Sequence, residues 1–534
     1  MPDSGPIRLG VISDGPYLPA WVLSEIRTMR EAGTLEVTHI IADGPKLKVP
    51  VFGDLSRWIY RRVARRYEYG LPALDATTLT PVSDISIETI GLDSIRAKRT
   101  PVFDLILCLS ETVRTQDVKS LTRTGVLQFE FGMGEYRHFD WNAAGLKEFL
   151  DREGSVRSAL VFEPNDSNYF RVVAQSYSCV HRFSFERTRN EMLWKSGTFL
   201  RRALKKKALS EPDAGQQSVG LECAPMNAER RCVPPPWTRN GVMMKGWMSY
   251  LVERLRVTRY RRRYVERWIL TYKRSPYATD FENFEKIHPP VGHFWADPCV
   301  VQHDDQLYLF FEEADIATGK GHIAAATLDG DGRPVDIRTV IFDRHHLSYP
   351  ILFRWKDRFY LIPESGDNSR IDLYVCDQFP YEWRFHSTLI DNINGYDATL
   401  LEYADRWWMF VNVQSVEGAS TWDELHIFFS DSPVSDTWTA HRQNPVVSDV
   451  RSARPAGPIF SREGKLVRPS QNCANRYGYG LNFFEIETLT PESYVERVIE
   501  RFVPAENSES LACHHYSSAG NVTFSDSIEA TRRS

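Results

Sequence analysis

Asp297 is the first residue whose surroundings point to chemistry. It lies in GHFWADPCVV, residues 292–301, between an alanine and a proline and among apolar and aromatic side chains. A carboxylate in such a setting is costly to bury without a partner. Three interpretations are open: a solvated loop residue, an acceptor of backbone N–H bonds, or one member of a functional site.

A repeat in the second half of the chain narrows the choice. Each unit has a short apolar strand, a polar turn with Asp or Gly, and a second strand; units of about fifty residues of this kind are typical of β-propeller blades. The segments are ADPCVVQHDDQLYLFFEE, SYPILFRWKDRFYLIPES, YDATLLEYADRWWMFVNV and PAGPIFSREGKLVRPSQN. RWILTYKR and HHYSSAGNVTFSD, from the two ends of this region, are expected to join in a fifth blade that closes the ring.

Equivalent positions of the repeat form two columns of side chains. The first column contains Asp297, Tyr349, Asp397 and Ala456, and the second contains Glu312, Glu364, Asn412 and Gln471. Because equivalent positions on successive blades face the same way around the axis, we expect both columns to line the central channel. With Arg454 they predict a pocket for a small polar ligand, in which Trp295, Tyr349 and Tyr396 offer aromatic faces to a sugar.

The alternative interpretation of these columns is structural. Blades also place polar residues in the channel to hydrogen-bond neighbouring strands, and for any single residue this explanation is as good as a ligand site. For the whole set, with two Asp, two Glu, one Asn and one Gln in register, a ligand site is favoured.

The first 200 residues have the pattern of an α/β domain. IRLGVIS, LEVTHIIA, DLILCLS and GVLQFEFG have the character of strands, and PAWVLSEIRTMREAG has apolar residues at helical spacing before a glycine. This alternation favours a largely parallel, doubly wound sheet, on which ligands bind at the carboxyl ends of the strands. We therefore expect a multidomain chain: an α/β domain at 1–200, a flexible linker at 201–240, a basic amphipathic helical segment at 241–267 and an all-β five-bladed propeller at 268–528.

The basic segment, residues 244–267, has two interpretations. Met244, Trp247, Leu251 and Leu255 fall on one helical face, and Lys and Arg far outnumber Glu. The favoured interpretation is a helix that packs on the neighbouring domain and keeps its arginines in solvent. The other is peripheral contact with an anionic membrane surface.

Composition excludes several classes of protein. The net charge of −5 gives the 534-residue chain no general attraction to nucleic acid, and no nucleic-acid motif is visible. No apolar stretch is long enough for a membrane span, and the N-terminus lacks the pattern of a secretory signal. The eight cysteines are scattered without a CxxC pair, which favours free thiols in a reducing cytoplasm over disulfides or a metal site. We expect a cytoplasmic protein, peripheral to the inner membrane face if the basic segment binds lipid.

The propeller region resembles the five-bladed propellers of family-43 glycoside hydrolases. In that family an ADP-like blade carries the general base, a later Asp tunes acidity, and a Glu in an EGP motif is the general acid. The resemblance places the base at Asp297 and the tuning carboxylate at Asp397, but the third motif is PAGP, with Ala456 in place of the acid. Inverting hydrolysis needs two carboxyl groups, and loss of the acid costs about 10²–10⁴ in rate.

A closer resemblance covers residues 265–525. FWADPCVVQHDDQLYLFFEE, HHLSYPILFRWKDRFYLIPES, ARPAGPIF and VRPSQNCANRYGYGL are similar to the N-terminal domain of plant glucosamine inositolphosphorylceramide transferases. In those proteins a separate domain resembles the glycosyltransferase. The resemblance therefore implies that the propeller handles a sugar, sugar nucleotide or glycolipid, more than that it catalyses a reaction.

The front half resembles, more weakly, the formyltransferase fold that uses 10-formyltetrahydrofolate. The likeness is carried by DLILCLSETV…TGVLQFEFGMGEYR, in which Gln128-Phe129-Glu130 stands where the family has Asn-x-His. Gln128 can still donate to an oxyanion, whereas Glu130 cannot supply a cationic imidazole. The resemblance implies 10-formyltetrahydrofolate as cofactor and Gln128 and Glu130 as catalytic candidates; Arg137 and His138 nearby are candidates for binding an anion.

Three functions remain open, in this order. The first is a carbohydrate-active transferase, of the formyl- or glycosyl-transfer type, in cell-surface glycan or glycolipid biosynthesis, with the donor on the α/β domain and the sugar acceptor on the propeller. The second is a non-catalytic carbohydrate-binding or scaffold protein, which Glu130 and Ala456 favour because both replace catalytic residues. The third is a propeller glycosidase with Asp297 as base and Asp397 as its modulator.

Overall fold

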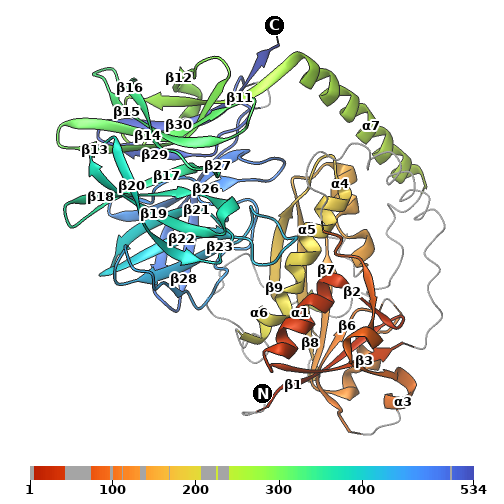
Figure 1. Ribbon diagram of the computed structural model, residues 1–534. Helices are drawn as coiled ribbons and strands as arrows, with labels where there is room; N and C mark the ends of the chain where they lie inside the picture. The colour runs from red at the N-terminus through yellow and green to blue at the C-terminus, as the bar shows by residue number, and fades with distance from the viewer. Residues whose placement is uncertain are drawn as a thin grey trace. The chain divides into compact units, whose positions relative to one another are not determined.

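A computed structural model describes residues 5–42, 74–96, 100–110, 112–132, 140–166, 169–205, 224–225, 240–505 and 508–533. The chain divides into two compact units, residues 1–255 with 416–420 and residues 256–415 with 421–534. The first unit contains a mixed sheet with helices, and the second is a five-bladed β-propeller (Figure 1). The expected fold class, α/β followed by an all-β propeller, is confirmed.

A single mixed sheet forms the frame of the first unit, with strand order β10-β9-β8-β7-β6-β1-β3-β5. Strands β5, β3, β1, β6 and β7 are parallel, as predicted, whereas β8, β9 and β10 are antiparallel. The short connection from β8 to β9 explains the antiparallel pairing of these two strands, because parallel neighbours need a long crossover. The strands are β1 Ile7–Ser13, β3 Leu35–Ile41, β5 Glu88–Gly91, β6 Phe103–Cys108, β7 Thr122–Phe131, β8 Ser155–Pro164, β9 Tyr169–Cys179 and β10 Ala224–Pro225, and a separate pair is β2 Tyr17–Pro19 with β4 Leu79–Pro81.

Helices cover both faces of this sheet. The helix α1 (Ala20–Glu31) buries Trp21, Leu23, Ile26 and Met29, the residues whose spacing predicted it. It packs with α5 (Phe185–Gly197) and α6 (Phe199–Lys205) over one face, whereas α3 (Leu92–Arg96) contributes to a second apolar cluster on the other. The helix α4 (Leu146–Asp151) precedes β8. This arrangement is the doubly wound sheet expected from the alternation of strands and helices.

The long helix α7 (Asn240–Arg263) follows the predicted linker. Between the end of α6 at Lys205 and the start of α7, only β10 lies among the described residues, so most of the linker predicted at 201–240 lies outside them. The strand β11 begins at Tyr264, inside the segment 241–267 that the sequence analysis treats as helical. Among the described residues, no helix is long and apolar enough to cross a membrane.

Five four-stranded sheets form the second unit, here named blades I to V. Blade I contains β13 His293–His303, β14 Gln306–Asp315, β15 Gly321–Leu328 and β16 Pro334–Ile341; blade II contains β17 Ser348–Trp355, β18 Arg358–Glu364, β19 Arg370–Gln378 and β20 Glu382–Asp391. Blade III contains β21 Gly395–Tyr403, β22 Arg406–Val413, β23 Leu425–Ser430 and β24 Thr439–Ala440; blade IV contains β25 Phe460–Arg462, β26 Lys465–Asn472, β27 Gly480–Leu489 and β28 Tyr494–Phe502. Blade V contains β12 Glu285–Ile287, β11 Tyr264–Lys273, β30 Val522–Arg532 and β29 Tyr516–Ala519.

Blade V joins the two ends of the propeller sequence. The strand β11 pairs with β30 from Tyr264 opposite Arg532 to Lys273 opposite Thr523, which is the predicted meeting of RWILTYKR with the C-terminal segment. The inner strand β13 contacts both β17 and β29, so blade I adjoins blades II and V. Hydrogen bonding between β11 and β30 therefore completes blade V from both ends of the propeller sequence, and the contact of β29 with β13 closes the ring.

Tight turns explain the polar residues that recur in the repeat. Lys356 and Asp357 have positive φ angles of 46° and 60°, and Ala404 and Asp405 have 52° and 56°. The flanking residues pair directly, so each hairpin has a two-residue loop. Two-residue loops with positive φ at both positions have the twist that antiparallel strands require, and Asp and Gly tolerate this backbone.

We expect Gly457→Ala to destabilise the propeller more than a matched glycine substitution. Gly457 has a φ of +117°, and an added Cβ would lie 2.0 Å from the backbone oxygen of Tyr516 in blade V. Gly464, the control, also has a positive φ, +77°, but has open space around it. A left-handed alanine costs about 1–2 kcal/mol, so Gly464→Ala should lose about that much and Gly457→Ala clearly more in urea unfolding. Equal losses would contradict the close approach of blades IV and V.

Candidate functional site

The first column of the repeat has an unusual backbone. Asp297, Tyr349 and Asp397 have φ angles of 53°, 46° and 55°, and each lies at a register shift in the inner strand of its blade. A bulge redirects a side chain, and a left-handed backbone is strained for residues other than glycine. Three successive blades have the same bulge with a positive φ at the equivalent position, so the equivalence of Asp297, Tyr349 and Asp397 is confirmed. In blade IV the positive φ falls on Gly457, one residue after the aligned Ala456.

The second column lies one strand outward at the same level. Glu312, Glu364 and Asn412 pair with Ala296, Ser348 and Tyr396, the residues that precede the bulged positions. In blade IV the backbone N–H of Gln471 donates to the Arg454 carbonyl at 2.8 Å. In blades I to III, equivalent side chains of the two columns therefore start from adjacent strands, and in blade IV the segment before β25 pairs with β26 through Pro455 and Ser470.

Arg454 holds the carboxylates of two other blades. Its Nε donates to Asp397 Oδ2 at 2.6 Å, and its Nη2 donates to Asp397 Oδ1 at 3.2 Å and to Glu364 Oε2 at 3.1 Å. Gln471 adds a donor to Asp397 Oδ2 at 2.7 Å. Burial opposes the charge of Arg454, but the neighbouring carboxylates raise its pKa well above the usual value. A buried bidentate ion pair is a strong, directional interaction, so Asp397 is an anchored acceptor.

A histidine lies between two further carboxylates of the propeller. His514 Nε2 is 3.2 Å from Asp297 Oδ1, and His514 Nδ1 is 2.8 Å from Asp526 Oδ2. Burial lowers the pKa of His514, but Asp526 and Asp297 outweigh it and raise that pKa well above the usual value. Asp297, His514 and Asp526 are also close enough to share one metal ion. Because each ring nitrogen lies near a carboxylate oxygen, the charge of a protonated imidazole is balanced by its two neighbours.

Asp297 forms hydrogen bonds with groups of both neighbouring blades. Its Oδ2 accepts from the Tyr349 N–H of blade II at 3.1 Å, and its own N–H donates to Asp526 Oδ2 of blade V at 3.1 Å. Asp526 Oδ1 also accepts from the backbone of His514 and His515. Asp297 therefore accepts one backbone N–H bond and donates another, which ties blade I to blades II and V, and it belongs to a charged cluster as well.

Glu312 and Glu364 also have charged neighbours, since Glu312 Oε1 lies 3.3 Å from His346 Nε2 and Glu364 Oε2 lies 3.1 Å from Arg454 Nη2. Burial raises the pKa of Glu312 well above its usual value, and Asp297 raises it further against the opposing effect of His514. Burial and Asp397 likewise raise the pKa of Glu364, although Arg454 opposes them. Both groups therefore favour the neutral acid, which can donate a hydrogen bond or a proton.

These contacts define what we call the axis cluster. The axis cluster consists of Asp297, Glu312, Glu364, Asp397, Arg454, Gln471, His514 and Asp526. The structure thus brings together six predicted site residues and adds two, His514 and Asp526, that the sequence analysis did not identify. The sequence gives little indication of these two residues, because the C-terminal segment matches the repeat only as the closing part of a blade.

Half-buried aromatic rings border the axis cluster. The ring centroid of Trp268 lies 4.0 Å from that of His514, and Tyr477 contacts His514 edge-on at 5.2 Å. The guanidinium of Arg454 lies 5.0 Å from the ring centre of Tyr477 and 5.4 Å from that of Tyr396. Trp422 lies beside Tyr477, and all four aromatic residues are partly exposed. We call Trp268, Tyr396, Trp422 and Tyr477 the aromatic rim; rings of this kind suit the apolar faces of sugars.

Three predicted ligand contacts have partners inside the propeller. Trp295 is 4% exposed and donates to Glu313 at 3.1 Å, and Tyr349 is 1% exposed and its hydroxyl accepts from the Gly457 N–H at 2.6 Å. Asn412 is fully buried and bonds the backbone of the 421–424 loop through both ends of its amide. Contact of these side chains with a ligand stays a prediction; Tyr396 is the aromatic residue among those predicted that lies in the rim.

The catalytic candidates of the first unit lie near the carboxyl end of β7. Glu130 is 1% exposed and its Oε1 is 2.8 Å from Arg157 Nη1 on the neighbouring β8, an ion pair that explains a buried glutamate there. Gln128 is half-buried on the same face of the strand. Their catalytic role stays a prediction, and the anion-binding candidates Arg137 and His138 lie outside the described residues.

The order of the parallel strands reverses between β1 and β6, the position at which open α/β sheets bind ligands. Asp14, directly after β1, accepts hydrogen bonds there from Ser110 at 2.5 Å and Thr112 at 2.9 Å, which follow β6. The neighbour of β6 is β7, the strand of Gln128 and Glu130. Gln128 and Glu130 therefore lie at the same edge of the sheet as the group formed by Asp14, Ser110 and Thr112.

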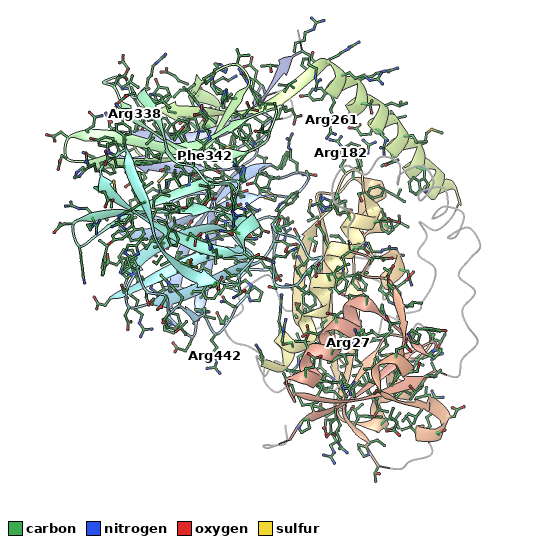
Figure 2. All side chains as sticks on the ribbon, viewed as in Figure 1. Arg27, Arg182, Arg261, Arg338, Phe342 and Arg442 are labelled. Atoms are coloured by element: carbon green, nitrogen blue, oxygen red, sulfur yellow. The ribbon has the colours of Figure 1, made fainter. Side chains whose placement is uncertain are left out.

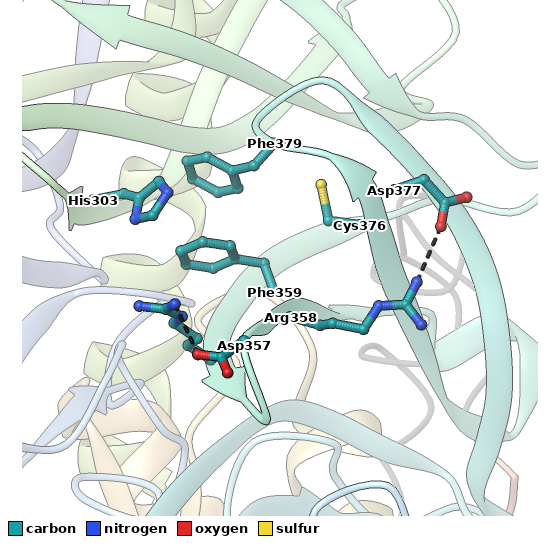
Figure 3. A pocket seen from close by; sticks show the side chains of 8 residues that line it. His303, Asp357, Arg358, Phe359, Cys376, Asp377 and Phe379 are labelled. Atoms are coloured by element: carbon teal, nitrogen blue, oxygen red, sulfur yellow. Dashed lines mark hydrogen bonds and ion pairs between the residues drawn. The ribbon is translucent and has the colours of Figure 1, made fainter.

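A separate pocket of about 290 Å³ lies at the surface of blades I and II (Figure 3). Phe359 and Phe379 stack in it at 4.1 Å, and His303 meets both rings edge-on. Its two arginines are already paired, Arg354 with Asp357 and Arg358 with Asp377. The pocket shares no residue with the axis cluster, and its charges are satisfied by its own lining.

Comparisons with known proteins confirm the resemblance of the propeller region. Residues 284–515 match the family described as glucosamine inositolphosphorylceramide transferase 1, N-terminal. Over 208 residues, 38% of this chain, the identity is 35% to glucosamine inositolphosphorylceramide transferase 1 of Oryza sativa subsp. japonica and 31% to that of Arabidopsis thaliana. The chain covers 28% and 27% of those proteins, so it spans less than a third of their length.

Solved structures with a similar course of the chain are more distant. A family 117 glycoside hydrolase, Zg3597 of Zobellia galactanivorans, is 11% identical with a TM-score of 0.33, over 49% of this chain and 90% of its own. CoXyl43, a family-43 β-xylosidase/α-arabinofuranosidase from a compost metagenome, is 14% identical with a TM-score of 0.33, over 46% of this chain and 93% of its own.

We expect Glu312→Gln to reduce the loss of stability at rising pH. In the unfolded chain Glu312 loses its proton above about pH 4.5, whereas burial keeps the proton on Glu312 in the folded chain. The free energy of unfolding therefore falls as the pH rises from about 4.5 toward the raised pKa of the folded state. The neutral amide removes this contribution, so the variant should gain at least about 1 kcal/mol relative to the parent at about pH 8. Urea unfolding between about pH 4.5 and pH 8 measures the difference. Glu492→Gln, on an exposed turn, is the control, and parallel pH profiles of parent and Glu312→Gln would contradict a neutral Glu312.

Proposed function

We propose that the propeller binds the sugar part of a glycan or glycolipid at its axis, as the acceptor-binding unit of a carbohydrate-active transferase. The observation that supports this proposal is the axis cluster bordered by the aromatic rim. Oriented carboxyls and an arginine match the hydroxyls of a sugar, and half-buried rings match its apolar face. The similarity of residues 284–515 to a family named for a glycolipid transferase supports the same class of ligand.

The chemistry of Asp297 favours binding over hydrolysis. A general base works best with a pKa near the operating pH, and it needs a free lone pair. The His514 and His515 side chains outweigh the effect of burial and hold the pKa of Asp297 far below its usual value. Its carboxylate is also occupied by these histidines and by the Tyr349 N–H. Ala456, at the position of the missing acid, is fully buried. We therefore propose no glycosidase activity for the propeller.

The transfer step belongs, in this proposal, to the first unit. We place it at the carboxyl ends of β1, β6 and β7, where the strand order reverses and where Asp14, Ser110 and Gln128 lie. The donor is either a formyl group from 10-formyltetrahydrofolate or a nucleotide sugar. The ion pair of Glu130 with Arg157 favours a second candidate, a non-catalytic carbohydrate-binding or scaffold protein. The pair accounts for a buried glutamate at this position without any catalytic role.

We expect Trp268→Ala to weaken sugar binding about tenfold, which corresponds to about 1.4 kcal/mol. The substitution removes the ring that lies over His514. Titration calorimetry of the full chain with glucosamine, N-acetylglucosamine, inositol phosphate and uridine diphosphate sugars measures the change. Tyr403→Ala is the matched control, because Tyr403 is an aromatic residue 44% exposed away from the rim. No binding of any of these probes, or equal binding by both variants, would count against the proposed site.

We expect the full chain to form product from one of two donors. It is incubated with amino-sugar nucleotides and 10-formyltetrahydrofolate, and separately with uridine diphosphate sugars and a glycolipid acceptor, and products are identified by mass spectrometry. Removing one donor to an oxyanion costs about 10²–10³ in rate, so Gln128→Ala should slow formyl transfer by this factor. Gln302→Ala, on the exposed surface of the propeller, is the control. Sugar binding without turnover from either donor would favour the non-catalytic candidate.

A further inference from the structure

The helix α7 presents an apolar stripe to solvent. Met248, Leu251, Val252 and Leu255 are 59%, 41%, 46% and 60% exposed. Their spacing of three, one and three residues places them on one face of the helix. This differs from the face expected from the sequence, because Trp247 is half-buried whereas Met248 and Val252 are exposed.

Packing of the opposite face fixes the direction of this stripe. Tyr250 is 6% exposed and lies 5.6 Å from Phe149 in ring-to-ring contact. Glu253 is 8% exposed and pairs with Arg152 at 3.3 Å and with Arg182. These contacts hold one side of α7 against the first unit, so the apolar stripe faces away from it.

Arginines continue the stripe toward the C-terminal end of α7. Arg259, Arg262 and Arg263 are exposed, and helical spacing places them on the same side as Leu255. Figure 2 labels Arg261 on this end of the helix. Glu253 is the single acidic residue in the helix and is buried in its ion pairs. A chain with a net charge of −5 thus carries a strongly basic, partly apolar helix face.

We propose that this face of α7 docks on an anionic lipid surface. Apolar side chains of an interfacial helix enter the boundary between headgroups and acyl chains, while arginines bind lipid phosphates. A nucleic acid would pair with the arginines but leave four exposed apolar side chains without a partner, whereas an anionic bilayer satisfies both. The proposal is independent of the proposed sugar site, because it depends on α7 alone and needs no sugar.

Vesicle sedimentation of the full chain tests the proposal. The vesicles contain phosphatidylcholine alone or phosphatidylcholine and phosphatidylglycerol in equal parts, at low and high salt. We expect binding to the anionic vesicles only, weakened by salt. Arg259→Gln with Arg262→Gln should reduce the partition coefficient about 30-fold, from about 1 kcal/mol for each arginine. Leu251→Ser with Leu255→Ser should reduce it at least tenfold, because both leucines lose apolar burial.

The control is a matched pair of exposed residues outside α7. Val291→Ser with Arg442→Gln removes one apolar residue, 97% exposed, and one exposed arginine, and it should bind as the parent does (Figure 2). Equal binding to both kinds of vesicle, or unchanged binding of either α7 variant, would overturn the proposal. Self-association of the parent in sedimentation velocity, abolished by the leucine substitutions, would also overturn it, because a second copy of the chain would then cover this face.

Discussion

Charge compensation at the propeller axis is the constraint on which the rest of this unit depends. Carboxyl groups from blades I, II, III and V converge there, and buried charges are tolerated only with partners. Arg454 neutralises Asp397, and His514 lies between Asp297 and Asp526. Because each of these contacts joins different blades or different strands, the same groups that form the cluster also hold the ring together.

This double role limits the chemistry that the axis offers. Asp397 accepts hydrogen bonds from Arg454 and Gln471. Asp297 Oδ2 accepts one from the Tyr349 N–H, and its Oδ1 lies 3.2 Å from His514 Nε2. The neutral carboxyl groups of Glu312 and Glu364 and the aromatic rim are what remains for a ligand. In the proposed function, these groups contact the hydroxyl groups and the apolar ring face of a sugar.

The two proposed interactions of the chain are compatible in their chemistry. Glycolipids carry their sugars at a membrane surface, and α7 carries the apolar and cationic residues that suit such a surface. His514 and His515 hold the pKa of Asp297 far below its usual value against the effect of burial, and a carboxylate of such low pKa is a weak general base, so we do not propose a glycosidase. The formyltransferase likeness of the first unit stays a prediction.

The sequence by itself determined the architecture of both units. Strand and turn patterns are local and repeat with the blades, so the five-bladed ring, its closure and the columns that begin with Asp297 and Glu312 could be predicted from spacing alone. Only the tertiary structure decided the partners of these columns. His514 and Asp526 come from more than two hundred residues after Asp297, and Trp268 comes from a strand that pairs with the far end of the chain. Arg157 pairs with Glu130 because β8 lies antiparallel to β7. Such contacts depend on how distant strands meet and not on local periodicity, so whether a buried carboxylate is free for chemistry cannot be read from its neighbours in sequence.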